Sequence, residues 1–212
     1  MAFNCKKNEQ NIVTVTMDMD GRSTNVINEE FSQLWAESLE KLENEKDLTG
    51  VILTSAKKTF LAGGDLEMLF KLDDPKLTFD LIEKGKARQR RLEHLGKPIV
   101  AAINGTALGG GLEIALCCNY RIVLNDPNIK IGFPEVTLGI MPGSGGIVRS
   151  IRLLGIEAAL PFLIEGKHLS PETAKKAGFI DDTADNLEGL IDKAKQYILT
   201  NLQVCQPWDK KG

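Results

Sequence analysis

Histidine is nearly absent from this chain, which contains only His94 and His168. This scarcity excludes a zinc site built from several histidines. A Ser-His-Asp or Cys-His arrangement would have to use one of these two residues, and the G-x-S-x-G nucleophile motif is missing. We predict that both histidines lie at the surface. Any acid–base chemistry is therefore expected to use carboxylates.

The sequence also lacks a secretory signal, a long apolar run and an excess of basic residues. Its start, MAFNCKK, has no hydrophobic stretch of signal-peptide length, and the longest uncharged stretch, 98–112, is too short and too rich in glycine to span a bilayer. The formal net charge of −3 argues against a nucleic-acid partner. The four cysteines contain no C-x-x-C pair, and we expect reduced thiols, with Cys117 and Cys118 buried. The cytoplasm, or a bacterial cell interior, is the predicted compartment.

What is present is a globular composition, with 42% hydrophobic and 26% charged residues over 212 positions. A chain of this size can bury a core without disulfides or metals. No repeat and no linker divides it. We predict a single domain over 1–212, with a core at about 12–178, a C-terminal helix at 187–202 and a tail at 203–212.

Hydrophobic periodicity predicts an α/β fold. Apolar or alternating runs predict strands at 12–19, 51–54, 99–103, 120–124 and 129–133. Helical spacing and capping signals predict helices at 28–42, 75–95, 112–118, 143–155, 171–178 and 187–202. Strands that alternate with helices in this way indicate a mostly parallel sheet with right-handed crossovers.

The centre of the chain is dense in glycine. Gly109, Gly110 and Gly111 lie between a predicted strand and a predicted helix, so unshielded backbone N–H groups should meet a helix N-terminus. The spacing matches neither phosphate-binding glycine motif, and Glu113 would repel a phosphate. Two interpretations stay open from spacing alone. The glycines could serve an oxyanion site with a nearby proton-transferring carboxylate, or they could simply permit close packing of helix and strand.

Three segments resemble the signature blocks of the crotonase superfamily, the enoyl-CoA hydratase/isomerase family. They are FLAGGDL at 60–66, INGTALGGGLE at 103–113 and FPEVTLGIMPGSGG at 133–146, in the family's order and spacing. The similarity extends from about Ile12 to about Gly178. It implies a crotonase-like fold, a spiral of ββα units with mostly parallel sheets flanked by helices.

The resemblance also implies a set of site residues. The backbone N–H groups of Gly64 and Gly110 correspond to the family's oxyanion hole, and Glu113 and Glu135 correspond to its two catalytic glutamates. The implied substrate-binding residues are Ala62, Gly63, Asp65, Leu66, Pro134 and Gly143.

Two glutamates favour hydration of trans-2-enoyl-CoA to 3-hydroxyacyl-CoA in fatty-acid β-oxidation. Glu113 would deprotonate water and Glu135 would protonate Cα, with acyl-CoA as substrate and neither a metal nor a cofactor required. The alternatives are a delta3-delta2-enoyl-CoA isomerase and a non-catalytic CoA-ester-binding or assembly module. The basic stretch from Lys84 to Arg91 could approach CoA phosphates, but we favour a solvated helix face.

The chain also resembles the N-terminal hydratase region of multifunctional fatty-acid β-oxidation α-subunits. Family members acting alone usually continue beyond the position of Leu202 with helices that cover the acyl site. We therefore expect a fragment without the C-terminal covering helices, and an NAD requirement only if a dehydrogenase region follows. A homo-oligomer or a thiolase subunit is the expected protein partner.

Overall fold

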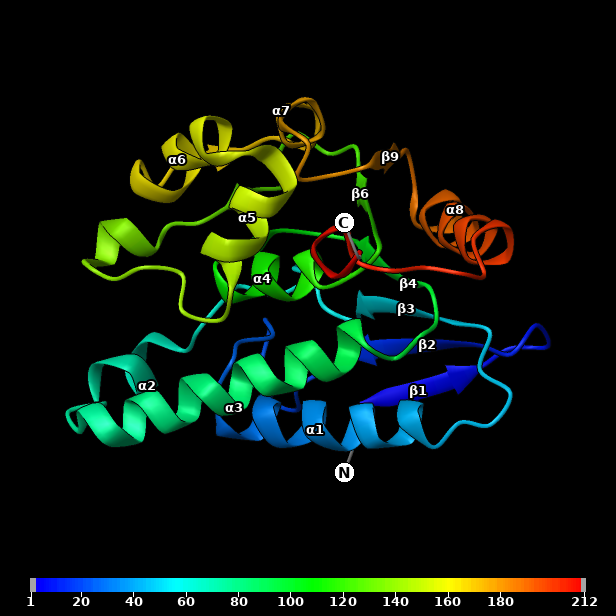
Figure 1. The fold of residues 1–212 in the computed structure, drawn as a ribbon, viewed down its shortest axis with the longest axis horizontal. Helices are drawn as coiled ribbons and strands as arrows, with labels where there is room; N and C mark the ends of the chain where they lie inside the picture. Colours follow the sequence, from blue (N-terminus) through cyan, green and yellow to red (C-terminus); the bar gives the residue numbers. More distant parts are fainter. Residues whose placement is uncertain (1–2, 211–212) are drawn as a thin grey trace.

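The computed structural model describes residues 3–210, and its centre is a six-stranded, mostly parallel sheet (Figure 1). In spatial order the strands are β1 (Asn4–Lys7), β2 (Ile12–Met17), β3 (Gly50–Ser55), β4 (Ile99–Ile103), β6 (Tyr120–Leu124) and β9 (Asp182–Ala184). Only β1 runs antiparallel to its neighbour. A second sheet has the order β5 (Ala107–Leu108), β7 (Ile131–Gly132), β8 (His168–Leu169).

Helices lie on both faces of the larger sheet. The helices of the described chain are α1 (Glu29–Glu43), α2 (Leu66–Phe70), α3 (Pro75–Glu93), α4 (Gly110–Leu116), α5 (Gly146–Leu154), α6 (Ile156–Ile164), α7 (Pro171–Ala177) and α8 (Leu187–Thr200), with 3-10 turns η1 (Glu135–Leu138) and η2 (Pro207–Asp209). Among them, α5 and α6 pack on each other and α5 packs on α4. In Figure 1, α1 and α3 lie side by side, and α8 packs beside the strands on its own. No helix within residues 3–210 is long and apolar enough to cross a membrane.

The alternation of side chains along the central strands explains the two covered faces. Val51 and Leu53 of β3 join the large core cluster, whereas Ile52 between them faces α8 and packs near Ile198. Successive side chains of a strand point to opposite faces, so a strand that is apolar throughout needs cover on both. The predicted mostly parallel sheet flanked by helices is confirmed.

Most predicted elements with a strong pattern are present, and the differences concern short ones. The predicted strand 129–133 narrows to β7, and the predicted helix 112–118 begins earlier, at Gly110. Hydrophobic periodicity did not predict β1, β5, β8, β9, α2 or α6. In the predicted tail, η2 packs against α5, while residues 211–212 lie outside the described part. The extent of a single domain stays a prediction.

The N-terminus of α4 contacts the loop after β3 very closely. A Cβ added to Gly111 would lie 2.1 Å from the carbonyl oxygen of Leu61. The Leu108 N–H donates to that same oxygen at 3.2 Å, which fixes the loop against β5. Glycine is therefore required at 111 because backbone occupies the space of a side chain. This contact brings the segment 61–64 to the beginning of α4.

We predict that Gly111→Ala destabilises the fold by about 3 kcal/mol, because the added methyl group must displace backbone. Gly85→Ala is the matched control: Gly85 lies inside α3, and its added Cβ would meet only Ser144 Oγ, at 3.7 Å. Alanine there should stabilise the helix by about 0.5–1 kcal/mol. Urea unfolding of both variants measures the difference. Equal stabilities would contradict the close approach of α4 to the loop.

Candidate active site

Glu113 lies in the first turn of α4, and its side chain is almost fully buried. One carboxylate oxygen, Oε1, accepts hydrogen bonds from the backbone N–H of Ser144 at 2.8 Å and of Gly146 at 2.7 Å. Gly146 is the first residue of α5, so the negative charge faces the positive end of that helix. The site thus joins two helices that are distant in sequence.

The second oxygen of Glu113 is directed differently. A Cβ built on Gly110 would lie 3.8 Å from Oε2, and within residues 3–210 this oxygen accepts no hydrogen bond. Burial raises the pKa of Glu113, while the two N–H donors and the charges of Arg149 and Lys86 oppose that rise. One oxygen is therefore fixed, and the other is free to accept a proton.

Glu135 opens the turn η1 and lies against the same glycines. A Cβ on Gly109 would lie 2.8 Å from its Oε1, and Gly109 has φ +52°, which only glycine adopts readily. Its Oε2 is buried and has no hydrogen-bond partner among residues 3–210. Burial, with a smaller contribution from the charge of Glu113, raises the pKa of Glu135 to about 7. This carboxyl group can hold or release a proton near neutral pH.

Two backbone donors complete the arrangement. Within the described chain, the N–H groups of Gly64 and Gly110 donate to no protein acceptor. They are near neighbours, because a Cβ on Gly63 would lie 3.7 Å from the nitrogen of Gly110. Ile27 holds the loop: its N–H donates to Gly63 O at 2.7 Å, and its carbonyl accepts from Asp65 N–H at 3.0 Å. An unpaired pair of donors of this kind can bind a carbonyl oxygen or an oxyanion.

The remaining predicted substrate-binding residues lie around these groups. Asp65 caps α2 by accepting from Glu67 N–H at 3.0 Å, and it also pairs with Arg22 at 3.1 Å. Ala62 is half-buried, Leu66 and Gly143 are exposed, and Pro134 directly precedes Glu135. Asp65 therefore has a capping role that sequence reasoning missed. The contact of these five residues, and of Gly63, with substrate stays a prediction.

Sequence reasoning also missed the residues that hold Glu113. Ser144 and Gly146 supply its two donors, and Arg149 of α5 is buried next to them. A glycine-rich turn before a helix was the available signal, but the partner lies 33 residues away from Gly146. Spacing in the chain cannot indicate that contact.

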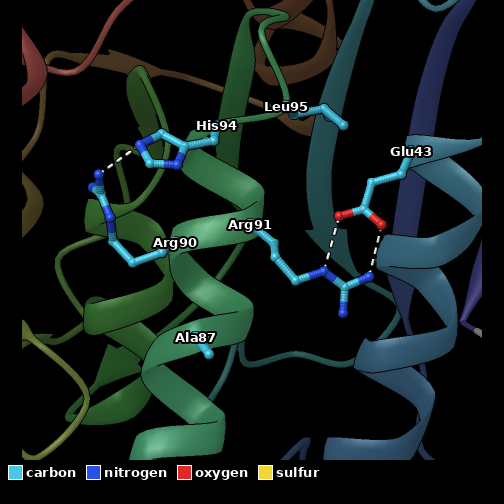
Figure 2. Close-up of a pocket in the computed structure, with 6 residues that line it drawn as sticks. All are labelled: Glu43, Ala87, Arg90, Arg91, His94 and Leu95. Atoms are coloured by element: carbon cyan, nitrogen blue, oxygen red, sulfur yellow. Dashed lines mark hydrogen bonds and ion pairs between the residues drawn. The ribbon is translucent and has the colours of Figure 1, made fainter.

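The basic stretch of α3 forms ion pairs at the surface. Arg91 donates to Glu43 of α1 at 2.9 and 2.7 Å, and Arg90 contacts His94 (Figure 2). These residues line a cleft of about 480 Å³ between α1 and α3, which includes none of the predicted site residues. The predicted surface position of both histidines is confirmed, because His94 and His168 are exposed.

The comparisons with known proteins agree with this geometry. The family model described as enoyl-CoA hydratase/isomerase matches residues 7–203. Among curated proteins, the fatty acid oxidation complex subunit alpha of Shewanella frigidimarina is 37% identical over 198 residues, covering 92% of this chain and 28% of the relative. The same subunit of Shewanella halifaxensis is 39% identical over 181 residues, covering 85% of this chain and 26% of the relative. The chain thus spans little more than a quarter of these relatives.

Solved structures extend the likeness to the fold. The enoyl-CoA hydratase of Thermoplasma volcanium superposes with a TM-score of 0.86 at 27% identity, covering 95% of this chain and 79% of the other. The enoyl-CoA hydratase of Bacillus anthracis gives a TM-score of 0.84 at 27% identity, covering 94% and 76%. With a family model that matches nearly its whole length and the expected glycines and glutamates in register, this chain belongs to the enoyl-CoA hydratase/isomerase family.

Proposed function

We propose that this chain adds water to trans-2-enoyl-CoA and forms 3-hydroxyacyl-CoA. One observation carries the proposal: two carboxyl groups in different hydrogen-bonding states lie beside two unpaired backbone N–H groups. Glu113 is fixed by two donors through one oxygen, whereas Glu135 has a buried oxygen without a partner. Hydration needs a base and an acid at once, and this pair supplies both.

In the proposed reaction, the thioester oxygen accepts hydrogen bonds from Gly64 N–H and Gly110 N–H. Negative charge grows on this oxygen as water attacks Cβ, and each such donor contributes roughly 3–4 kcal/mol in the transition state. Glu113 Oε2 takes one proton from the attacking water, and the remaining hydroxyl bonds to Cβ. Glu135 gives its proton to Cα. Both carboxyl groups return to their starting states by proton exchange with solvent.

The relatives support a wider setting for the proposal. Their name, subunit alpha of a fatty acid oxidation complex, supports a role in β-oxidation and a second type of subunit, such as a thiolase, as partner. We propose that hydration itself uses neither a metal nor NAD. Cys117 and Cys118 are buried, unpaired thiols, which fits the reducing interior of a cell. The cytoplasm is therefore the proposed compartment.

Replacing either glutamate with glutamine tests whether Glu113 acts as the base and Glu135 as the acid. Glu113→Gln and Glu135→Gln should each lower the kcat of hydration by about 10²–10⁴-fold, because each removes one proton-transferring group and retains the side-chain shape. The loss of the enoyl thioester absorbance measures the rate. Glu172→Gln, at an exposed site on α7, is the control and should leave the rate unchanged.

The same variants separate hydration from a second candidate reaction. Glu135, with a free oxygen and a pKa near 7, also suits double-bond isomerisation, which needs one group to take and return a proton. Isomerisation of a 3-enoyl-CoA should therefore persist in Glu113→Gln and disappear in Glu135→Gln. The hydratase mechanism is wrong if both variants hydrate as the parent does, or if EDTA abolishes hydration.

The pKa of Glu135 predicts a pH dependence. As the proposed acid it must carry a proton, so kcat/KM for hydration should fall as pH rises through about 7. The titration of Glu135 can also be measured without activity, through the stability of the protein. A carboxyl pKa raised from 4.5 to about 7 contributes stability that is complete below pH 4.5 and is lost as pH rises through 7.

Because glutamine does not titrate, the Tm of Glu135→Gln relative to the parent should increase between pH 4.5 and pH 7.5. Thermal unfolding at a series of pH values measures this difference. A Tm difference that is constant with pH would show that the Glu135 pKa is ordinary.

The oxyanion donors are tested at Gly110. Gly110→Pro removes one N–H at the first position of α4, where proline is tolerated, and should lower kcat more than it raises KM. Gly110→Ala is the matched control, because it retains the N–H. Its Cβ would lie 2.5 Å from the movable end of Ile27, which must shift, and in ordinary contact with Glu113 Oε2 at 3.8 Å. If the folded proline variant has the kcat of the alanine variant, the oxyanion site lies elsewhere.

A further inference from the structure

Arg149 is a buried arginine on α5 whose guanidinium is held from two sides. Its Nε donates to Glu93 Oε1 at 2.6 Å, and its Nη1 donates to Gln89 Oε1 and to the carbonyl of Ser144, both at 3.1 Å. Glu93 and Gln89 belong to α3, whereas Ser144 precedes α5. The side chain is 6% exposed. The guanidinium therefore connects α3 to the turn before α5 in a fixed geometry.

That turn is the one that holds Glu113. Ser144 offers its carbonyl to Arg149 and its N–H to Glu113, and Gly146 N–H provides the second donor. A Cβ on Gly145 would lie 2.0 Å from Arg149 Nη1, and Gly145 has φ +101°. The backbone of the turn therefore lies in direct contact with the guanidinium of Arg149. Movement of Arg149 would move both donors to Glu113.

Glu93 is in turn anchored on its other side. Its side chain is fully buried, and its second oxygen accepts from Arg90, which also pairs with Asp209 of η2 at 2.7 Å. A buried ion pair adds little net stability compared with well-packed apolar residues, since desolvation offsets the attraction. The network is better explained by the geometry it imposes than by the stability it contributes.

We propose that Arg149, locked by Glu93, is a positioning residue for the reaction. It fixes the Ser144–Gly146 turn so that Glu113 is held through Oε1 and presents Oε2 to water. This inference rests on the proposed function for its kinetic consequence, but its geometric part can be tested alone.

The kinetic test compares Arg149→Met with Arg121→Met. Arg121 is the matched control, because it is also buried and bonds one carboxylate and two carbonyls, those of Asp181, Phe179 and Cys118. Arg149→Met should lower kcat 10- to 100-fold with KM for the thioester within threefold, and Arg149→Lys should recover part of the loss. Arg121→Met should retain the parent kcat even if its Tm falls. An Arg149→Met kcat within twofold of the parent overturns the proposal.

The geometric test uses backbone amide NMR and needs no activity. Glu113→Gln marks how the Ser144 and Gly146 amide resonances shift when the carboxylate is lost. Arg149→Met should shift both resonances in the same direction, and Arg121→Met should not. Glu93→Gln preserves side-chain volume and should cause the same shift. This variant replaces Arg149→Met in the test if Arg149→Met does not fold. Unmoved resonances in the folded variants overturn the proposal, whereas shifted resonances in a chain without hydratase activity would refute the proposed function alone.

Discussion

The arrangement of this protein depends on holding one buried carboxylate, Glu113, by two backbone N–H groups, that of Ser144 in the turn before α5 and that of Gly146 at the first position of α5. A carboxylate removed from water loses solvation, and unless it is compensated it takes up a proton and ceases to be a base. The N-terminus of α5 supplies that compensation on one oxygen only. The constraint explains why α4 and α5, separated in sequence, must pack together. It also explains why the turn between η1 and α5 needs glycine at 145 and 146, where added Cβ atoms would meet Arg149 and Glu113.

Close approach of backbone is the second condition. The N–H groups of Gly64 and Gly110, the proposed oxyanion donors, can be neighbours only if the loop 61–64 contacts the beginning of α4, and Gly111 makes that contact possible. Glu135 then lies against Gly109, where the negative charge of Glu113 disfavours a second negative charge on Glu135. Burial is the main reason that the pKa of Glu135 is raised to about 7, and the charge of Glu113 adds to it. The two glutamates therefore lie in different environments, which is what the proposed acid and base need.

The sequence predicted those helices and strands that are long enough to show a hydrophobic periodicity. The apolar runs of β3 and β4 and the stripe on α1 were visible, whereas β5 and β8 have two residues each and β9 has three, too few for any pattern. The motifs indicated Gly64, Gly110, Glu113 and Glu135 as candidate site residues because each lies in a contiguous block, and their roles in catalysis stay predictions. Arg149 and Glu93 are 56 residues apart, and neither belongs to a block, so only the folded chain brings them together.

The proposed reaction adds water across a double bond, and mass spectrometry of the product tests it. The product is formed from a trans-2-enoyl-CoA in oxygen-18 water mixed with deuterium oxide. Hydration would place one oxygen-18 atom at C3 and one deuterium at Cα, with both incorporated at the catalysed rate. Deuterium incorporation without oxygen-18, which isomerisation or simple exchange would give, would contradict it.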